Sequence, residues 1–387
     1  SVNTQSVSTD TGLFQATFRA ADWVGQFKRV AVDEITVGGG RTRLEVGDTE
    51  WKAANDGLGN TGTLDAMDWD NDRQILTYKP SADKGIPFRW PTGGTPSDEL
   101  DSAQEDKLAD NPETEGILDP QPAPAGKNVL NYIRGERANE GTDGDDFRRR
   151  NTVLGDIVHS APVFVAQPNF IIPESLSPEG SYEAFRQAKA GRDPMVYVGA
   201  NDGMLHGFDS DTGEERIAYV PSPVYDNLAE LTSQDYSHKY FVDGSPTYAD
   251  AWFESNPDPD DSGAAWRSVL VGTLRGGGQG VYALDITDPS NFEEDNAEDL
   301  VLWEFTDDDA ESNGDDDLGY VFGRASVVRL AHDNEWVATF GNGFNSSETD
   351  GNAGSGEAVL FAADIEDGSK IAEVSTGEGP SDDPQGS

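Results

Sequence analysis

Cysteine is absent from all 387 residues of the sequence. Disulfide scaffolds, thiolate zinc sites and cysteine nucleophiles are therefore excluded. The sequence also lacks any apolar run near the length of about 18 residues that a membrane-spanning helix requires. We accordingly expect a protein without disulfides and without membrane insertion.

Basic residues are scarce, with 27 Lys and Arg against 73 Asp and Glu, and the formal net charge is −46. Nucleic acids and anionic membranes are poor partners for so acidic a surface, because like charges repel. Two interpretations of the acidity remain open and can coexist. The charge can solvate the surface, as in a protein adapted to high salt, or the carboxylates can bind divalent cations.

Helical periodicity is also rare. The apolar runs are short, rich in Val, Tyr, Phe and Leu, and bounded by Gly, Asp, Asn or Pro, which is the pattern of strands and turns. The 43 glycines and 21 prolines fit frequent turns. Only residues 182–190 and 224–232 are predicted as short helices. The sequence therefore predicts an all-β fold.

Three repeated units follow one another from Ser160 onward. The serines at their first strands, Ser160, Ser245 and Ser326, are 85 and 81 residues apart. Each unit has four short apolar runs, which in the first are SAPVFVA, PMVYVG, MLHGFDSDTG and ERIAYVPS. Four-stranded units in series are typical of propeller blades, because one blade needs neighbours to bury both faces of its sheet. We therefore predict a β-propeller of four-stranded blades.

The domain organisation follows from these units. Residues 1–90 are predicted as an N-terminal β unit and first blade, with strands beginning near Leu13, Gly25, Thr42 and Arg73. The acidic, Pro-rich segment at 91–150 is predicted as a loop and lead-in. Residues 151–379 are predicted as three regular blades, and 380–387 as a disordered tail.

The acidic loop TDDDAESNGDDDLGY, residues 306–320, is the best candidate for a metal site. Its order approximates the start of a calcium loop, in which alternate oxygen-bearing side chains precede a glycine. Glutamate stands where Asp or Asn is usual, however, and Tyr320 stands where a bidentate glutamate is expected. A solvated acidic loop is the alternative. The predicted calcium ligands are Asp309, Glu311, Asn313, Asp315 and Asp317.

Motifs of catalysis are missing from the sequence. It contains no nucleophile elbow, no P-loop and no histidine pair at zinc-ligand spacing. The stretch GANDGMLHGFDSDTGEE, residues 199–215, has the Asx and Gly residues of hairpin turns. A calcium contribution from Asp209 and Asp211 is the alternative. We predict no catalytic residues and no enzyme activity.

Seven sequence blocks occur in order across most of the chain. They are FRRRNTVLGDIVHSAPVFV, MVYVGANDGMLHGFDSDTGEE, YFVDGSPTYADAWF, VLVGTLRGGGQGVYALDITDP, VLWEFTDDD, LGYVFGRASVVRL and FGNGFNS. Together they resemble the C-terminal β-propeller of the PilC/PilY family of type IV pilus biogenesis factors and tip adhesins. The resemblance implies an extracellular or outer-surface protein at the pilus tip. Such a protein supports pilus biogenesis, retraction control and surface adhesion, with pilin or minor pilin subunits as partners.

The resemblance also implies calcium and a propeller of about seven blades, so that the ring is expected to be incomplete here. The family's best-marked calcium loop follows the blades seen in this chain. Some members carry an RGD tripeptide where this chain has Arg134, Gly135 and Glu136. Glutamate displaces the carboxylate by one methylene, so integrin binding is not carried over.

Two other functions remain open. Quinoprotein dehydrogenases also use a Gly-x-Asp-Gly pattern followed by Asp-x-x-Thr-Gly in their propeller blades, and residues 199–213 resemble it. A structural surface protein of a salt-adapted organism would account for the acidity without any adhesive role.

Overall fold

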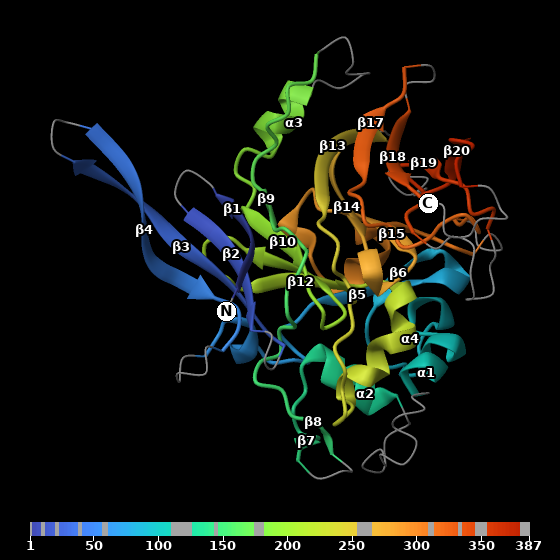
Figure 1. Ribbon diagram of the computed structural model, residues 1–387, viewed down its shortest axis with the longest axis horizontal. Helices are drawn as coiled ribbons and strands as arrows, with labels where there is room; N and C mark the ends of the chain where they lie inside the picture. The colour runs from blue at the N-terminus through green and yellow to red at the C-terminus, as the bar shows by residue number, and fades with distance from the viewer. Residues whose placement is uncertain are drawn as a thin grey trace.

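Strands dominate the computed structural model of the protein (Figure 1). The structure describes residues 2–8, 12–19, 23–37, 41–55, 61–109, 126–142, 146–173, 182–253, 265–308, 313–331, 335–344 and 354–379. The strands are β1 (Val2–Ser8), β2 (Gly12–Arg19), β3 (Val24–Val37), β4 (Arg41–Lys52), β5 (Ile75–Lys79), β6 (Lys84–Pro87), β7 (Glu140–Gly141), β8 (Phe147–Arg148), β9 (Val163–Val165), β10 (Met195–Gly199), β11 (Leu205–Asp209), β12 (Glu215–Val220), β13 (Thr247–Phe253), β14 (Ala265–Thr273), β15 (Gly280–Asp285), β16 (Val301–Thr306), β17 (Ser326–Arg329), β18 (Trp336–Gly341), β19 (Val359–Asp364) and β20 (Lys370–Ser375). The α-helices are α1 (Ser102–Ala109), α2 (Lys127–Arg134), α3 (Tyr182–Ala188), α4 (Tyr225–Leu228) and α5 (Ala297–Leu300).

Four large sheets follow one another in chain order. The first has the order β1-β2-β3-β4, the third β13-β14-β15-β16 and the fourth β17-β18-β19-β20. The second has the order β6-β5-β12-β11-β10-β9, which is a four-stranded unit with two additional strands. The inner strand β13 contacts both β9 and β17, so the first strands of consecutive units lie side by side. The prediction of four-stranded propeller blades is confirmed.

The fourth strand predicted for the N-terminal unit, near Arg73, is wrong. It corresponds to β5, which pairs in parallel with β12 (Ile75 opposite Ala218) and belongs to the second sheet. All five residues of β5 are buried, so the strand needs cover on both faces. In the first sheet β1 occupies the place next to β2, and the sheet has its four strands without β5.

The described part of residues 91–150, predicted as a loop and lead-in, is exposed at 92–98 and contains two helices that the sequence did not predict. Helices α1 and α2 bury Leu108, Leu130 and Ile133 in the apolar core of the second sheet. Each helix has eight residues, too few for a clear helical pattern in an acidic, Pro-rich segment. The domain boundaries stay predictions, and the tail predicted at 380–387 lies outside the described residues.

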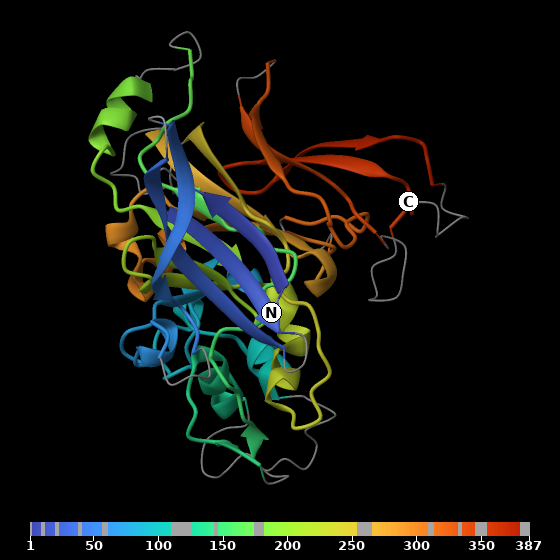
Figure 2. The same cartoon turned by 60° about the vertical axis from the view of Figure 1, so that its left-hand side comes forward.

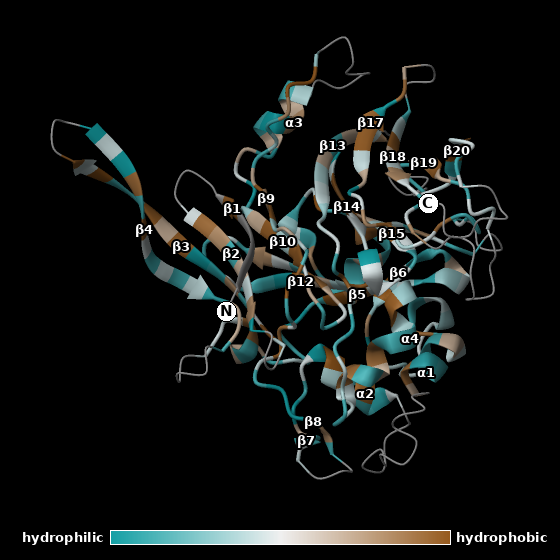
Figure 3. Ribbon diagram, viewed as in Figure 1, coloured by the Kyte–Doolittle hydropathy of each residue, from teal (hydrophilic) through white to brown (hydrophobic). Residues whose placement is uncertain are grey.

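Apolar clusters lie between consecutive sheets, and the strands in the middle of the series are mostly apolar (Figure 3). Each fully buried large apolar side chain contributes about 1.5–3 kcal/mol to folding. Between the first and second sheets the cluster includes Phe14, Phe27, Trp51, Val196 and Phe208. Between the third and fourth sheets it includes Val271, Trp303, Phe305, Phe340 and Phe361.

The series of sheets stays open. No described apolar cluster joins the first sheet to the last, and Figure 2 shows the β17–β20 sheet projecting away from the rest. The outer face of this last sheet exposes Val328, Leu360 and Val374, which have no further sheet to pack against. The expectation of an incomplete propeller is confirmed.

Candidate metal site and an arginine clamp

The structure describes three of the five predicted calcium ligands. Asp309 and Glu311 lie outside the described residues. Asn313, Asp315 and Asp317 lie in the connection that follows β16, where Gly314 forms a parallel bridge with Thr306. The chain near Gly314 therefore lies beside the end of β16, the outer strand of the third sheet.

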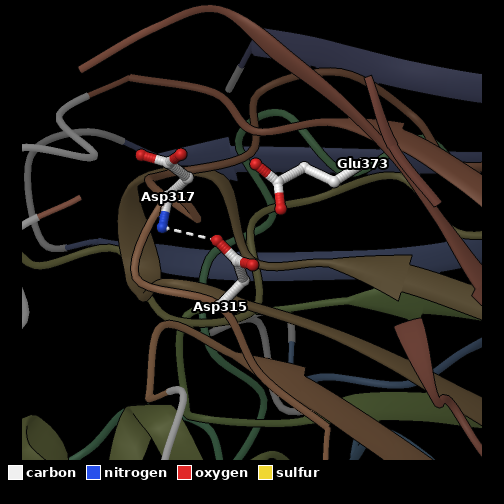
Figure 4. Close-up of side chains that lie close together, drawn as sticks. All are labelled: Asp315, Asp317 and Glu373. Carbon is white, nitrogen blue, oxygen red and sulfur yellow. Dashed lines mark hydrogen bonds between the residues drawn. The ribbon is translucent and has the colours of Figure 1, made fainter. Parts of the chain in front are cut away.

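Asn313 does not join the two aspartates in one group. Its side-chain amide donates a hydrogen bond of 2.7 Å to the carbonyl of Asp367. Carboxylate oxygens of Asp315, Asp317 and Glu373 lie within 4.8 Å of one another. The backbone N–H of Asp317 donates to Asp315 over 2.8 Å, as Figure 4 shows. The candidate site therefore bridges the 306–325 connection and strand β20.

Glu373 was missed by the sequence analysis, because its place depends on how the third and fourth sheets pack. It stands in the last strand of the fourth blade with no metal-loop spacing around it. Its position near Asp315 and Asp317 could have been predicted only from knowing that the third and fourth blades are neighbours.

Lys370 already neutralises part of this group. Its ammonium lies against the Asp315 carboxylate and 3.0 Å from Glu373. Burial lowers the pKa of Lys370, but the hydrogen bonds to these carboxylates outweigh that effect and raise it. Asp317 accepts a hydrogen bond of 2.9 Å from the Ser355 hydroxyl. Calcium needs six to eight oxygen ligands and would compete with the lysine here, so calcium binding stays a prediction.

Arg134, the first residue of the tripeptide at the RGD position, is 1% exposed. It donates hydrogen bonds of 2.8 Å to the Phe88 carbonyl and to Glu294. Gly135 ends α2 with φ of +123°, a conformation that other residues rarely adopt. Arg134 is therefore buried in the protein and is not available to a receptor in this conformation.

A second group of buried charged residues is hydrogen-bonded to Arg134 through Arg73. Arg73 binds Glu215 with both Nε (2.6 Å) and Nη2 (2.9 Å), and its Nη1 donates to the carbonyl of Arg134. Glu215 also bonds Nδ1 of His206 over 2.6 Å, and Nε2 of His206 lies 3.1 Å from Asp202. We call the six residues the arginine clamp: Arg73, Arg134, Asp202, His206, Glu215 and Glu294.

The electrostatics of the clamp favour its charged form. Burial by itself would raise the pKa of Glu215, but Arg73 and His206 lower it to about 2. Burial opposes protonation of His206, but Asp202 and Glu215 raise its pKa to about 9. Opposite charges thus compensate one another inside the protein, and they join the lead-in segment to the second and third sheets.

The stretch at 199–215 therefore contributes structure. Besides His206 and Glu215 in the clamp, it has Asp209, whose carboxylate accepts bonds from the backbone of Asp211 and Thr212 in an Asx turn. Asp211 pairs with Arg29 of the first sheet over 2.6 Å. Turn formation and the joining of sheets account for these residues.

Comparison with known proteins shows which sequences resemble this chain. The sequence profile of the PilY1 beta-propeller domain matches residues 154–383. Type IV pilus biogenesis factor PilY1 of Pseudomonas aeruginosa (strain PAK) is 34% identical over 365 residues, which cover 92% of this chain and 26% of that protein. A PilY1 homolog of Xylella fastidiosa is 41% identical over 227 residues, covering 58% of this chain and 17% of that protein.

One solved structure is also similar. The crystal structure of the P. aeruginosa PilY1 C-terminal domain has 37% sequence identity and a TM-score of 0.41. The match covers 55% of this chain and 37% of that one. The present chain spans about a quarter of the length of the P. aeruginosa relative described above.

Proposed function

This chain belongs to the PilY1 β-propeller family, and on that premise we propose that it acts in type IV pilus biogenesis. The observation that carries the proposal is the family match over residues 154–383, the part of the chain that contains the three regular blades. The relatives are named type IV pilus biogenesis factors. This chain spans about a quarter of the P. aeruginosa relative, so we extend the role of that whole protein to it as a proposal.

The proposed activity is binding and not catalysis. Each described histidine is bonded to a buried carboxylate: His159 to Asp243, His206 to Glu215 and His238 to Asp156. Such pairs suit structural bonding between connections. This supports a rigid scaffold that presents its connections to other proteins, and it gives the quinoprotein alternative no added support.

The proposed partners are pilin or minor pilin subunits, and the proposed location is the cell surface or the pilus tip, with a role in retraction control and surface adhesion. Among the described residues, no helix has the length and apolarity to cross a membrane. A surface with a net charge of −46 disfavours nucleic acid. Calcium at Asp315, Asp317 and Glu373 is proposed as an ion that would fasten the 306–325 connection to β20.

Deletion in the source organism tests the proposed function. An in-frame deletion of codons 151–379 should reduce the number of surface pili and abolish twitching, and the intact gene should restore both. Normal piliation, twitching and adhesion in the deletion strain would contradict the proposal. Quinone-dependent dye reduction by the purified protein would instead support the dehydrogenase alternative.

A further inference from the structure

Six side chains from the connections between strands lie in contact as a row that is exposed at Trp23, Tyr240 and Phe322 and mostly covered at His238. Trp23 stacks on His238 with ring centroids 3.7 Å apart, and His238 meets Tyr240 at 5.1 Å. Tyr240 lies 5.5 Å from His159. We call Trp23, His238, Tyr240, His159, Arg275 and Phe322 the aromatic row.

Asp243 connects the two halves of the row. It bonds Nδ1 of His159 over 2.6 Å and lies 3.4 Å from Nε of Arg275. The guanidinium of Arg275 stands 5.0 Å from the ring centroid of Phe322, and its Nη1 donates to the Phe322 carbonyl over 2.9 Å. The row thus runs from the first sheet to the connection between the third and fourth sheets.

Three aromatic side chains of the row face solvent, and the Arg275 side chain is partly exposed. Trp23 and Tyr240 are each 37% exposed, and Phe322 is 49% exposed. The carboxylates beneath it, Asp156 and Asp243, are only 2% and 3% exposed and are bonded to His238 and His159. The surface chemistry here is therefore unlike the acidity of the whole chain.

Two residues of the row hold an unfavourable backbone conformation. Only three non-glycine residues in the described part of the chain have positive φ: Trp23 (+50°), Asp83 (+53°) and Arg275 (+54°). Aspartate tolerates this conformation, whereas for a bulky residue it is a genuine outlier. Glycine would adopt it without strain. Strained backbone conformations cluster at functional sites, where a particular side chain is needed in that position.

The composition of the row is that of a protein interface. Tryptophan, tyrosine and arginine are enriched among the residues that dominate binding energy, and charged pairs at the rim guide orientation. Additional cations border the row. Arg324, two residues after Phe322 in the chain, is exposed, and the exposed Arg149 lines a hollow together with Trp23. The complementary surface is an apolar patch bordered by carboxylates.

We propose that the aromatic row docks a folded subunit of the pilus through an apolar patch bordered by carboxylates. This inference rests on the proposed function, which supplies the class of partner. The row supplies the site on this chain. Stacking against Trp23, Tyr240 and Phe322 contributes the affinity, and Arg275 and Arg324 fix the orientation.

Binding measurements with matched variants test the proposal. The probes are soluble ectodomains of the major and minor pilins encoded in the same genome, with the 387-residue chain immobilised for biolayer interferometry. Arg275→Gly relieves the backbone but removes one of the two partners of the buried Asp243, which keeps its bond to His159, so the variant should stay folded and should bind at least tenfold more weakly. Phe322→Ala should weaken binding similarly. Phe170→Ala, which removes an aromatic ring that is 38% exposed outside the row, should bind as wild type does.

The outcomes separate the two claims. If wild type binds a pilin ectodomain and both Arg275→Gly and Phe322→Ala bind equally well, the docking role of the row is overturned while the proposed function stands. If wild type binds none of the ectodomains, this inference and the proposed pilin contact are both overturned. The piliation phenotype of the deletion strain then decides separately on the function in biogenesis.

Discussion

At the scale of single residues, the arginine clamp shows how this acidic chain holds charge in its interior. Arg73 and Glu215 have side chains that are 2% and 0% exposed, and they bind through two parallel hydrogen bonds. Removing one partner of a buried pair leaves the other without compensation, which costs more than the pair contributes by itself. The clamp is therefore a point where one substitution should have a large effect.

Replacement of Arg73 by methionine should lower the free energy of unfolding by about 3–5 kcal/mol, because Glu215 is left buried without its main counter-charge. Chemical denaturation measures this change. The matched control is Arg43→Met, which removes an arginine that is exposed and pairs with Glu45 at the surface. The control should unfold as wild type does. Equal effects of the two substitutions would contradict the account of the clamp.

His206 should make stability depend on alkaline pH. Its pKa is raised from 6.5 to about 9 in the folded protein, so its contribution is complete below pH 6.5 and is lost as the pH rises through 9. The loss should be about 3 kcal/mol. The pKa of Glu215 is lowered from 4.5 to about 2, so its contribution is present above pH 4.5 and is lost as the pH falls through 2.

Denaturation of wild type and His206→Gln between pH 6 and 9.5 measures the alkaline part. The difference in unfolding free energy between the two proteins should shrink as the pH rises. A difference that stays constant over this range would show that His206 is not protonated in the folded state.

At the scale of elements, the sequence predicted the strands of the regular blades because their apolar runs repeat with similar turns. The runs at Ser160, Ser245 and Ser326 lead into β9, β13 and β17 as expected. The sequence analysis assigned β5 to the wrong sheet, because the local sequence does not indicate that β5 pairs in parallel with β12. Helices α1 and α2 were missed because each is short and buries only a few side chains.

The candidate site was predictable only in its local part. Asp315 and Asp317 were found from the order of residues in one loop. Glu373 and Lys370 reach the site from β20, and their roles depend on packing between blades. The sequence did not predict the aromatic row either. Its members are single residues in separate connections, and only the packing of the blades brings them together.

Calcium should stabilise the protein if the candidate site binds it. At a concentration 100 times the dissociation constant, a ligand that binds only the folded state adds about 2.7 kcal/mol. Melting curves with calcium, and with magnesium as control, measure the effect for wild type and Asp315→Asn. Wild type should be stabilised by millimolar calcium and Asp315→Asn should not. If calcium leaves the melting temperature of wild type unchanged, the proposed calcium site is wrong.

At the scale of the whole molecule, the open series of sheets explains an exposed apolar face on an acidic protein. Val328, Leu360 and Val374 on the last sheet are 39%, 48% and 55% exposed. Each earlier sheet covers the corresponding face of its neighbour with apolar side chains. An uncovered face of this kind favours association, and the net charge of −46 opposes it.

The isolated chain should therefore associate weakly, and more strongly as salt screens the repulsion between copies. Sedimentation velocity at low and high salt measures this. Leu360→Glu should reduce the association without lowering the melting temperature, because its side chain lies half in solvent. A chain that is monomeric at all salt concentrations would contradict the expected role of this face.

We propose above all that this chain serves the type IV pilus. Gold labelling of intact cells with an antibody against residues 151–379 tests it most directly, with a deletion strain as the control for specificity. The account predicts label on pili, concentrated at the ends of the filaments. Label that is confined to the cell body and absent from the pili would contradict it.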